Sequence, residues 1–360
     1  MSRERVKKVF VALSGGVDSS VSLYLLKKAG YDVTACFIKI GECVQSPKDE
    51  KIDIDKCWIG ERREAMRVAA YLDVPFLTFD FDKEYKKAVL NYFFREYKAG
   101  RTPNPDVMCN REIKFPLFWK KAKAMGADFM ATGHYAQVHK NTEYELLAGK
   151  DKEKDQSYFL YNLKEKDLEH ILFPVGGYIK KEVRAIAKQA GIPTAEKKDS
   201  QGLCFLGQIN VREFLKTKIK PKKGKVVDVN GKTVGEHEGL AYYTIGQRHG
   251  LGVSGGSEKY FVIGKNEKKN ELVVALEKDE KNFYQKSLEI SGVTWVSGAS
   301  QFPLKCSARI RYRAPLQKCR IIKSGKNIRV EFDKPQRAVT PGQSVVFYDG
   351  DIVLGGGIIV

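Results

Sequence analysis

Two adjacent glycines directly behind an apolar run constrain this chain more than any other feature. Residues 9–12 are apolar, and residues 13–20 read Leu-Ser-Gly-Gly-Val-Asp-Ser-Ser, an order that predicts a strand, a tight turn and a helix. Glycine adopts positive φ without steric cost, so the backbone N–H groups of such a turn are able to close around an anion. Serine hydroxyls and the start of the helix add donors and partial positive charge. The segment therefore predicts a phosphate-binding turn.

The turn contains no lysine, so it does not match the Walker loop of enzymes that transfer a γ-phosphate. Residues 14–19, Ser-Gly-Gly-Val-Asp-Ser, instead resemble the PP-loop of ATP pyrophosphatases. That resemblance implies cleavage of ATP between its α- and β-phosphates with release of pyrophosphate. The predicted ATP contacts in this segment are Ala12, Leu13, Ser14, Gly15, Gly16, Val17, Asp18 and Ser19. The simpler alternative is a glycine turn that only starts a helix.

The composition is that of a globular and strongly basic chain. Its 360 residues are enough for two or three domains, and a hydrophobic content of 42% is typical of folded proteins. The 63 Lys and Arg residues exceed the 44 Asp and Glu residues, which gives a formal net charge of +19. A charge of this size predicts a polyanionic partner such as a nucleic acid, bound through phosphate contacts.

Cysteine usage and the apolar segments indicate the compartment. The seven cysteines are dispersed along the chain, and an odd number without a secretion signal favours a reducing cytoplasm over a disulfide framework. The apolar residues before the glycine turn are too few for a signal-peptide core, and no stretch approaches a membrane span. We therefore expect a cytoplasmic protein with no membrane partner. The sequence has no compact Cys-x-x-Cys pair, the spacing that would predict a bound metal or iron–sulfur cluster.

Strand-like and helical segments alternate as far as about residue 200. Apolar runs at 33–38, 76–80 and 129–132 are separated by helical patterns, which predicts an α/β fold with a Rossmann-like parallel sheet. Ligands bind beyond the carboxyl ends of such strands, where residues 14–19 and 132–134 fall. Beyond Lys216 the pattern becomes β-rich, and the alternating segment 306–312 belongs to an expected C-terminal β-barrel. We predict a catalytic domain 1–207, a small central domain 208–282 and a barrel 283–360.

Two cysteines lie in polar surroundings. Cys109 follows Gly-Arg-Thr-Pro-Asn-Pro-Asp at 100–106, and the two prolines predict a rigid loop beside a helix start, where the helix dipole and Arg111 favour the thiolate. Cys204 lies in the polar, glycine-bearing segment 198–207. Either residue could instead be an inert surface thiol. Three other cysteines lie in apolar or alternating β segments and are predicted to be structural: Cys36, Cys306 and Cys319.

Over essentially its whole length the chain resembles the tRNA-specific 2-thiouridylases. Besides the PP-loop, the resemblance rests on residues 100–110, 132–136, 154–160, the Cys204 segment and 243–248. It implies an adenine nucleotide alpha hydrolase-like PP-loop domain followed by a central and a barrel domain that both bind tRNA. It also implies ATP and Mg²⁺ as cofactors, tRNA as the substrate, and a sulfur-relay protein or cysteine desulfurase as persulfide donor.

The same resemblance implies roles for single residues. Cys204 would carry the persulfide, Cys109 would be the partner nucleophile, and Asp106 would be an acid or base near the target base. Asp18 would be a phosphate-side or magnesium-linked carboxylate, although a helix-capping role fits it as well. Ile38 and Gly133 join the ATP contacts. The implied target-base and tRNA contacts are Asn104, Pro105, Asp106, His134, Lys154, Asp155, Gln156, Arg311, Tyr312 and Gln343.

The implied reaction is ATP-dependent 2-thiolation of the wobble uridine, position 34, of tRNA. The C2 oxygen of uracil is a poor leaving group, and adenylation converts it into one that sulfur is able to displace as AMP. Sulfur would come from the Cys204 persulfide. Cys109 would release it by forming a transient Cys109–Cys204 disulfide, which a cellular reductant resets.

Two other functions fit parts of the sequence. Another PP-loop ATP-dependent synthetase, acting on a small molecule, would need neither Cys109 nor Cys204. A basic RNA-binding protein with a vestigial PP-loop would explain the charge but would release no AMP or pyrophosphate. An iron–sulfur cluster on Cys109, Cys204 and a third cysteine is a further possibility that the spacing does not support.

Overall fold

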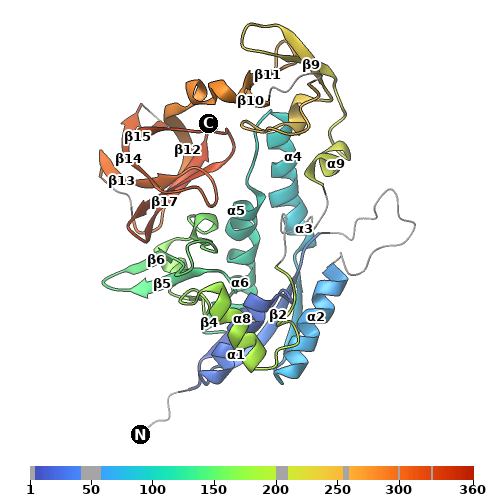
Figure 1. Ribbon diagram of the computed structural model, residues 1–360. Helices are drawn as coiled ribbons and strands as arrows, with labels where there is room; N and C mark the ends of the chain where they lie inside the picture. Colours follow the sequence, from blue (N-terminus) through green and yellow to red (C-terminus); the bar gives the residue numbers. More distant parts are fainter. Residues whose placement is uncertain (1–4, 42–57, 200–209, 254–258, 299–300, 326) are drawn as a thin grey trace, which may run out of the picture.

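The computed structural model describes residues 5–41, 58–199, 210–253, 259–298, 301–325 and 327–360. Three regions surround a column of helices formed by α4 (Asn91–Lys98), α5 (Pro105–Cys109) and α6 (Pro116–Ala124) (Figure 1). A parallel sheet lies at the α6 end, a small sheet lies at the α4 end, and a barrel lies beside the column (Figure 1). The column belongs to the N-terminal region and yet contacts all three.

The parallel sheet has the strand order β3-β2-β1-β4-β7. Its strands are β1 (Lys8–Ala12), β2 (Asp32–Lys39), β3 (Phe76–Asp80), β4 (Phe129–Ala131) and β7 (Ile171–Leu172). From β1 the chain builds outward through β2 and β3, and it then returns to place β4 on the other side of β1. This reversal of order between β1 and β4 is where doubly wound sheets bind ligands.

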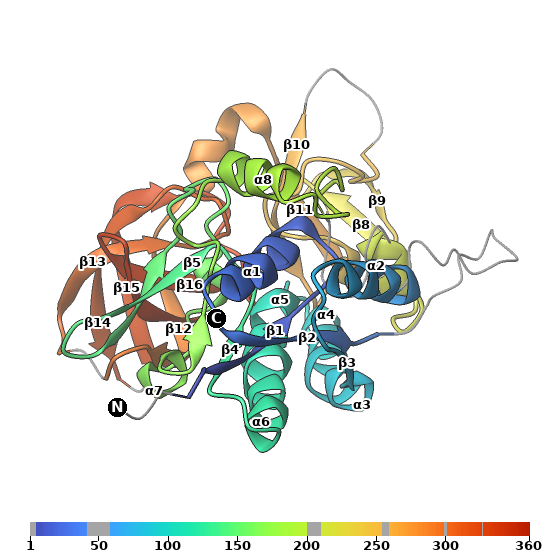
Figure 2. The same ribbon diagram turned by 90° about the horizontal axis from the view of Figure 1, so that it is seen from below.

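Helices cover both faces of this sheet (Figure 2). One face carries α1 (Val17–Lys28), α2 (Trp58–Tyr71) and α8 (Lys180–Gln189), and the other carries α3 (Asp82–Tyr85), α4, α5 and α6. Successive residues of β1 serve opposite faces, because Val9 and Val11 pack against α1 while Phe10 packs against the helices of the column. The central strand β1 is apolar and buried from Val9 to Val11, as expected of a strand covered on both faces, whereas the edge strand β3 exposes Thr78 and Asp80.

The small central sheet has the order β10-β11-β8-β9. It comprises β8 (Gly224–Val227), β9 (Thr233–His237), β10 (Tyr260–Asn266) and β11 (Glu271–Leu276), and α9 (Val211–Lys216) precedes it. Phe93 and Tyr97 of α4 are buried in the same core as Leu215 and Val262. The central region therefore completes its core with a helix of the N-terminal region.

Six antiparallel strands form the C-terminal barrel, which closes where β12 pairs with both β15 and β17. They are β12 (Gln285–Trp295), β13 (Leu304–Arg309), β14 (Gln317–Ser324), β15 (Asn327–Gln336), β16 (Ser344–Asp349) and β17 (Ile352–Ile359). The hairpin β5 (Ala136–Lys140) and β6 (Tyr144–Ala148) extends this sheet, since Leu147 lies opposite Ile352. A short helix, α7 (Glu165–Leu168), follows the hairpin.

The predicted fold class is confirmed: a Rossmann-like parallel sheet, a small β-rich region and a C-terminal barrel. The domain bounds 1–207, 208–282 and 283–360 stay predictions, and the structure adds that α4 and the β5–β6 hairpin share cores or sheets across them. The strand expected over 306–312 ends at Arg309. In the described residues, none of the helices has the length and apolar character needed to cross a membrane.

Candidate functional site

The phosphate turn lies between β1 and α1 and is closed by its own serines. The backbone N–H of Ser14 donates to Oγ of Ser19 at 3.2 Å, and the two hydroxyl oxygens lie 3.1 Å apart. Gly16 is the N-cap of α1 and has no side chain to occupy the N–H groups of the first helical turn. The start of α1 therefore presents donors and a positive dipole end to the turn, an arrangement that suits an anion.

Close backbone approach explains two glycines of the site. Gly15 has a φ of 76°, and a Cβ there would lie 2.6 Å from the backbone oxygen of Glu61. Gly133 follows β4, and its Cβ would lie 2.7 Å from the backbone nitrogen of Ser19. The turn after β4 is thus in direct contact with the first turn of α1 at the switch point. The other predicted ATP contacts frame the same edge of the sheet: Ala12 ends β1, Leu13 and Val17 are buried, and Ile38 is near the end of β2.

Asp18, in the first turn of α1, is the centre of a polar network. Nζ of Lys180 lies 2.7 and 2.8 Å from its two carboxylate oxygens, and the Tyr135 hydroxyl donates to it at 2.8 Å. Lys180 also pairs with Asp199 at 2.9 Å, and Lys154 and Arg184 each reach Asp199 at 2.7 Å. Partial burial works to raise the pKa of Asp199, but the hydrogen bonds from Lys154 and Lys180 outweigh it and hold that pKa well below its usual range.

Lys197 also contacts the phosphate turn, and the sequence analysis does not predict it. Its Nζ donates to the backbone oxygen of Gly15 at 3.0 Å, and the side chain is half-buried. In the described part of the chain this ammonium group bonds a carbonyl and forms no ion pair with a carboxylate. The turn, which has no lysine of its own, thus receives cations from Lys180 and Lys197, more than 160 residues away in the chain. No local pattern could have identified them.

Thr132, Gly133 and His134 connect the phosphate turn to the helix column. Nδ1 of His134 lies 2.7 Å from the Thr132 hydroxyl, and its ring packs against both Phe115 and Phe173, with centroid distances of 5.8 and 6.2 Å. Burial of the ring, assisted by the charge of Lys114, lowers the pKa of His134 to about 3. His134 is therefore neutral at physiological pH and contributes a hydrogen-bonding edge without charge.

The segment around Cys109 corrects one prediction. Instead of a loop, the chain forms α5, in which Asn104 is the N-cap and accepts a hydrogen bond from the Val107 N–H at 3.2 Å. Pro105 occupies the first turn, where its fixed φ and missing N–H favour a helix. Cys109 ends α5 and is completely buried. The dipole argument for a thiolate fails because the thiol is at the wrong end of the helix, and Arg111 is engaged with Glu112 at 2.7 Å.

The residues beside Cys109 place two further polar groups near it. Asp106 is half-buried in the first turn of α5. Asn110 is buried, and its Nδ2 donates to the Phe159 carbonyl at 3.2 Å, while its Oδ1 accepts no hydrogen bond from any residue that the structure describes. Cys204, the other cysteine of the predicted pair, lies outside the described residues, so the approach of the two thiols stays a prediction.

The predicted tRNA residues 154–156 contact the polar network around Asp18, since Lys154 and Gln156 bond its members Asp199 and Tyr135. Lys154 pairs with Asp199, and Gln156 exchanges hydrogen bonds with the backbone of Tyr135 at 2.8 and 3.0 Å. Asp155 is buried, accepts from the N–H groups of Gly149 and Ser157 at 3.0 Å, and pairs with Arg309 of the barrel at 3.3 Å. Asp155 therefore shapes this turn from inside, whereas Lys154 keeps a partly exposed ammonium group.

The three predicted barrel contacts have different surroundings. Tyr312 is half-buried, and its ring centroid lies 4.5 Å from that of Phe159. Nη2 of Arg311 donates to the carbonyls of Ile245 and Ala338 at 3.0 and 2.7 Å and to the Thr340 hydroxyl at 2.7 Å. Burial lowers the pKa of Arg311, and Arg337 adds to this effect. Gln343 donates to two carbonyls of the segment before α5.

The cysteines predicted to be structural lie in strands. Burial raises the pKa of Cys36 to about 12, so its thiol is unreactive near neutral pH. Cys306 and Cys319 lie opposite each other on β13 and β14, with their sulfur atoms 3.6 Å apart.

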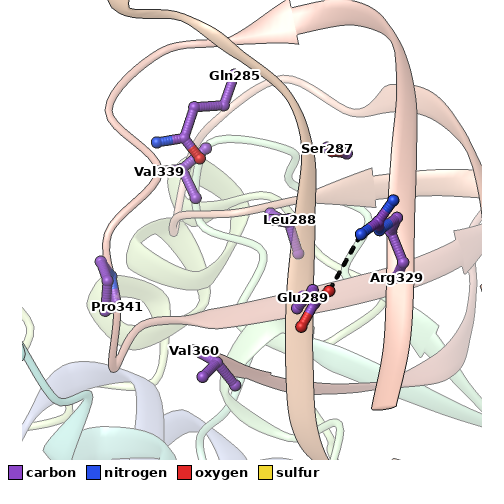
Figure 3. A pocket seen from close by; sticks show the side chains of 8 residues that line it. All are labelled: Gln285, Ser287, Leu288, Glu289, Arg329, Val339, Pro341 and Val360. Atoms are coloured by element: carbon purple, nitrogen blue, oxygen red, sulfur yellow. Dashed lines mark hydrogen bonds and ion pairs between the residues drawn. The ribbon is translucent and has the colours of Figure 1, made fainter. Parts of the chain in front are cut away.

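A cavity of about 340 Å³ opens at one end of the barrel, beside β12 and β15 (Figure 3). It is lined by Gln285, Ser287, Leu288, Glu289, Arg329, Val339, Pro341 and Val360. Glu289 of β12 and Arg329 of β15, which face each other on neighbouring strands, form an ion pair at 3.2 Å in the wall of the cavity. None of the predicted ATP or tRNA residues lines this cavity.

Three family profiles match consecutive parts of the chain. Residues 7–208 match the profile described as tRNA methyl transferase HUP domain, residues 212–276 the tRNA methyl transferase PRC-barrel domain, and residues 285–359 the Aminomethyltransferase beta-barrel domain. These ranges follow the parallel sheet, the central sheet and the barrel described above.

Curated relatives match over nearly their full length. A protein of Halalkalibacterium halodurans is 47% identical over 362 residues, covering 99% of this chain and 95% of its own. Proteins of Alkaliphilus oremlandii and Streptococcus sanguinis are 46% and 45% identical and cover 98% and 100% of this chain and 96% of their own. All three bear the name tRNA-specific 2-thiouridylase MnmA. A solved 4-thiouridine synthetase–RNA complex with bound ATP gives a TM-score of 0.36 at 21% identity, over 59% of this chain and 50% of that one, a likeness too low to bear on function.

Proposed function

The chain belongs to the family of tRNA-specific 2-thiouridylases, and from this membership we propose that it thiolates C2 of the wobble uridine of tRNA at the expense of ATP. The reaction has two halves. ATP adenylates the C2 oxygen and pyrophosphate leaves; a sulfur nucleophile then displaces AMP from C2. The two halves need a phosphate-binding site and a reactive cysteine, both close to the same base.

One observation carries the proposal: a continuous set of contacts joins the phosphate turn to the helix of Cys109. Gly133 packs against the backbone of Ser19 in the first turn of α1, and the neighbouring His134 ring packs against Phe115, the residue that follows the π-helical turn Asn110–Lys114 after Cys109. A base bound over the Thr132–His134 turn would therefore have the α-phosphate on one side and the α5 side chains on the other.

The adenylation half falls to the β1–α1 turn. The N–H groups of the turn and the uncapped start of α1 would hold the pyrophosphate, with Lys180 and Lys197 as cationic partners. Mg²⁺ bound with ATP neutralises phosphate charge and keeps several water ligands, so one carboxylate from the protein is enough. Asp18 is the half-buried carboxylate at the turn and would hold the ion in exchange for its contacts with Lys180 and Tyr135.

The sulfur half falls to Cys204 and Cys109. A desulfurase or sulfur-relay protein would load Cys204 as a persulfide, and the terminal sulfur would attack C2. Formation of a Cys109–Cys204 disulfide would release that sulfur, and a dithiol reductant would restore both thiols. Because Cys109 is completely buried, substrate binding must expose it. Asp106, on the same helix, is our candidate for proton transfer at the base.

The test is direct. Purified protein is incubated with unmodified tRNA, ATP, Mg²⁺ and a persulfide donor, and the tRNA is digested to nucleosides for mass spectrometry, while AMP and pyrophosphate are assayed in parallel. We expect 2-thiouridine and matching amounts of AMP and pyrophosphate, all dependent on tRNA.

Two variants separate this proposal from its rivals. Cys109→Ser and Cys204→Ser are expected to abolish 2-thiouridine while pyrophosphate release persists. If both variants thiolate tRNA normally, the proposed sulfur chemistry is wrong. AMP formation with a small-molecule acceptor but without tRNA would indicate another PP-loop synthetase, and tRNA binding without any ATP cleavage would indicate an RNA-binding protein with a vestigial loop.

A further inference from the structure

The short segment before α5, residues 100–104, is held by the barrel. The backbone N–H of Thr102 donates to the carbonyl of Pro341 at 2.9 Å. The Nε2 atom of Gln343 donates to the carbonyls of Thr102 and Pro103 at 2.8 and 3.1 Å. One side chain of the barrel thus satisfies two consecutive carbonyls of a segment about 240 residues earlier in the chain.

The central region holds the same segment from another side. Nζ of Lys265, on β10, donates to the carbonyl of Gly100 at 2.8 Å, and the hydroxyls of Thr102 and Thr244 lie 3.1 Å apart. Arg311 ties the neighbouring residues together, because its guanidinium bonds both Ile245 of the central region and the 338–340 turn of the barrel. We call residues 100–104, 244–246, 338–343 and Arg311 the three-way joint.

Within the three-way joint, Gly342 packs directly against the backbone of Thr102. Gly342 has a φ of 92°, and a Cβ there would lie 2.9 Å from the carbonyl oxygen of Thr102. On the outside, Val339 and Pro341 border the cavity at the end of the barrel (Figure 3). The hydrogen bonds to residues 102 and 103 and the close contact at Gly342 both fix this turn against the segment before α5.

Whatever fixes residues 100–103 also fixes the start of α5. Asn104, the next residue, caps the helix, and α5 carries Asp106 and Cys109. Tyr158 adds a link, because its hydroxyl donates to the carbonyl of Ser344, next to Gln343, at 2.8 Å. A shift of the barrel turn would therefore move the helix that bears the proposed acid and nucleophile.

We propose that Gln343 is a positioning residue: it fixes the segment that starts α5, and so sets the place of Asp106 and Cys109, rather than binding tRNA through its amide nitrogen. Its two N–H bonds already go to Thr102 and Pro103. This inference rests on the proposed thiolation, and it assigns to Gln343 the link between the barrel and the helix that carries the reacting groups.

The test separates chemistry from tRNA binding. Single-turnover thiolation at saturating tRNA gives the rate of the chemical steps, and filter binding gives the Kd for tRNA. Losing two hydrogen bonds that hold a reacting segment is expected to lower the single-turnover rate of Gln343→Ala by about tenfold, with the Kd within about twofold of wild type. Gln343→Glu, which places a carboxylate against two carbonyl oxygens, is expected to be slower still.

Gly342→Ala disturbs the same contact without touching the amide. We expect the same pattern, a lower rate at nearly unchanged Kd. Gln301→Ala, an exposed glutamine of the barrel region, is the matched control and should behave as wild type. Hydrogen exchange read by mass spectrometry adds a readout independent of activity: the peptide covering the start of α5 should exchange faster in Gln343→Ala than in Gln301→Ala.

Opposite results overturn the inference. If Gln343→Ala weakens tRNA binding while the saturated rate and the α5 exchange stay at wild-type values, Gln343 is an RNA contact. If wild type itself fails to thiolate tRNA, the proposed function fails instead, and the hydrogen-exchange comparison still decides whether Gln343 positions α5.

Discussion

The phosphate turn and the α5 segment reach their geometry by different means. The turn is closed within a few residues, since Ser14, Gly16 and Ser19 bond one another and the strand and helix on either side are continuous with it. The α5 segment is fixed from outside, by Gln343 of the barrel and Lys265 of the central sheet. The hydrogen bonds that close the first come from one βα unit, whereas those that hold the second join three regions of the chain. Changes far from the chemistry should therefore affect the second half-site more than the first.

The largest expected effect tests the assembly of the barrel on the N-terminal region. Asp155→Ala removes a buried carboxylate and leaves the Arg309 guanidinium without its partner, together with two backbone N–H groups. Breaking a buried pair of this kind costs about 3 kcal/mol of the free energy of unfolding. Urea denaturation followed by circular dichroism measures it.

Asp351→Ala is the matched control for that change. Lys152 and Asp351 also connect the 148–157 turn to the barrel, at 2.6 Å, but both side chains are about 60% exposed. Solvent screening limits the cost of removing such a pair to under about 1 kcal/mol. Equal losses for the two variants would show that burial does not distinguish these links.

The second prediction concerns the phosphate turn, the site that is closed by its own residues. Gly15→Ala puts a Cβ 2.6 Å from the Glu61 backbone oxygen at a φ of 76°, so the turn must shift. A displacement of about 1 Å in a reacting site costs about a hundredfold in rate, and we expect pyrophosphate release to fall by that factor while the Kd for tRNA is unchanged. Gly30→Ala is the control, because its φ is also positive, 85°, but nothing lies within 4 Å of the added Cβ.

The local half-site was largely predictable from the sequence. The apolar strand, the glycine turn and the turn at 132–134 can each be recognised within a short stretch of sequence. The structure places both turns at the switch point of the sheet. The loop expected at Cys109 was wrong, although its correction was present in the sequence. An Asn followed by Pro is a signature of a helix N-cap and first turn as well as of a loop, and at Asn104 and Pro105 the helix forms.

Other features could not be predicted from local patterns. The alternation at 306–312 predicts a strand through Tyr312, but β13 ends at Arg309 and Arg313 has a φ of 62°. The chain turns there, and the Arg311 side chain enters the three-way joint. That contact depends on residues 66 and 27 positions away. Gln343 and Lys197 are similar cases, since their partners lie in another region of the chain.

Lys197 gives the third prediction, an intermediate effect on the phosphate side. Lys197→Met removes the ammonium group 3.0 Å from the Gly15 carbonyl, and loss of one charged contact to a phosphate is expected to raise the KM for ATP about tenfold. Pyrophosphate release at varied ATP concentration measures it. Lys198→Met, at the exposed neighbouring position, should leave the KM unchanged, and the same KM for both variants would remove Lys197 from the phosphate site.

The smallest effect concerns the pH dependence of the joint. Burial lowers the pKa of Lys265 to about 8, against an opposing effect of Glu267. Between pH 8 and about 10.5 the unfolded chain therefore binds more protons at this lysine than the folded chain, so its contribution to the free energy of unfolding rises with pH across that window and is constant below it.

Lys265→Met removes this dependence. We compare the free energy of unfolding of the variant with that of wild type at each pH. Loss of the hydrogen bond to Gly100 lowers the value for the variant by an amount that does not depend on pH. On top of that constant, the difference should be most favourable to the variant near pH 7 and should decline steadily as pH rises from 8 to 10.5. Urea denaturation at several pH values provides the comparison, with the exposed Lys268→Met as control. A pH-independent difference would mean that Lys265 titrates as an exposed lysine, and the central sheet would then hold residues 100–104 more loosely than the barrel does.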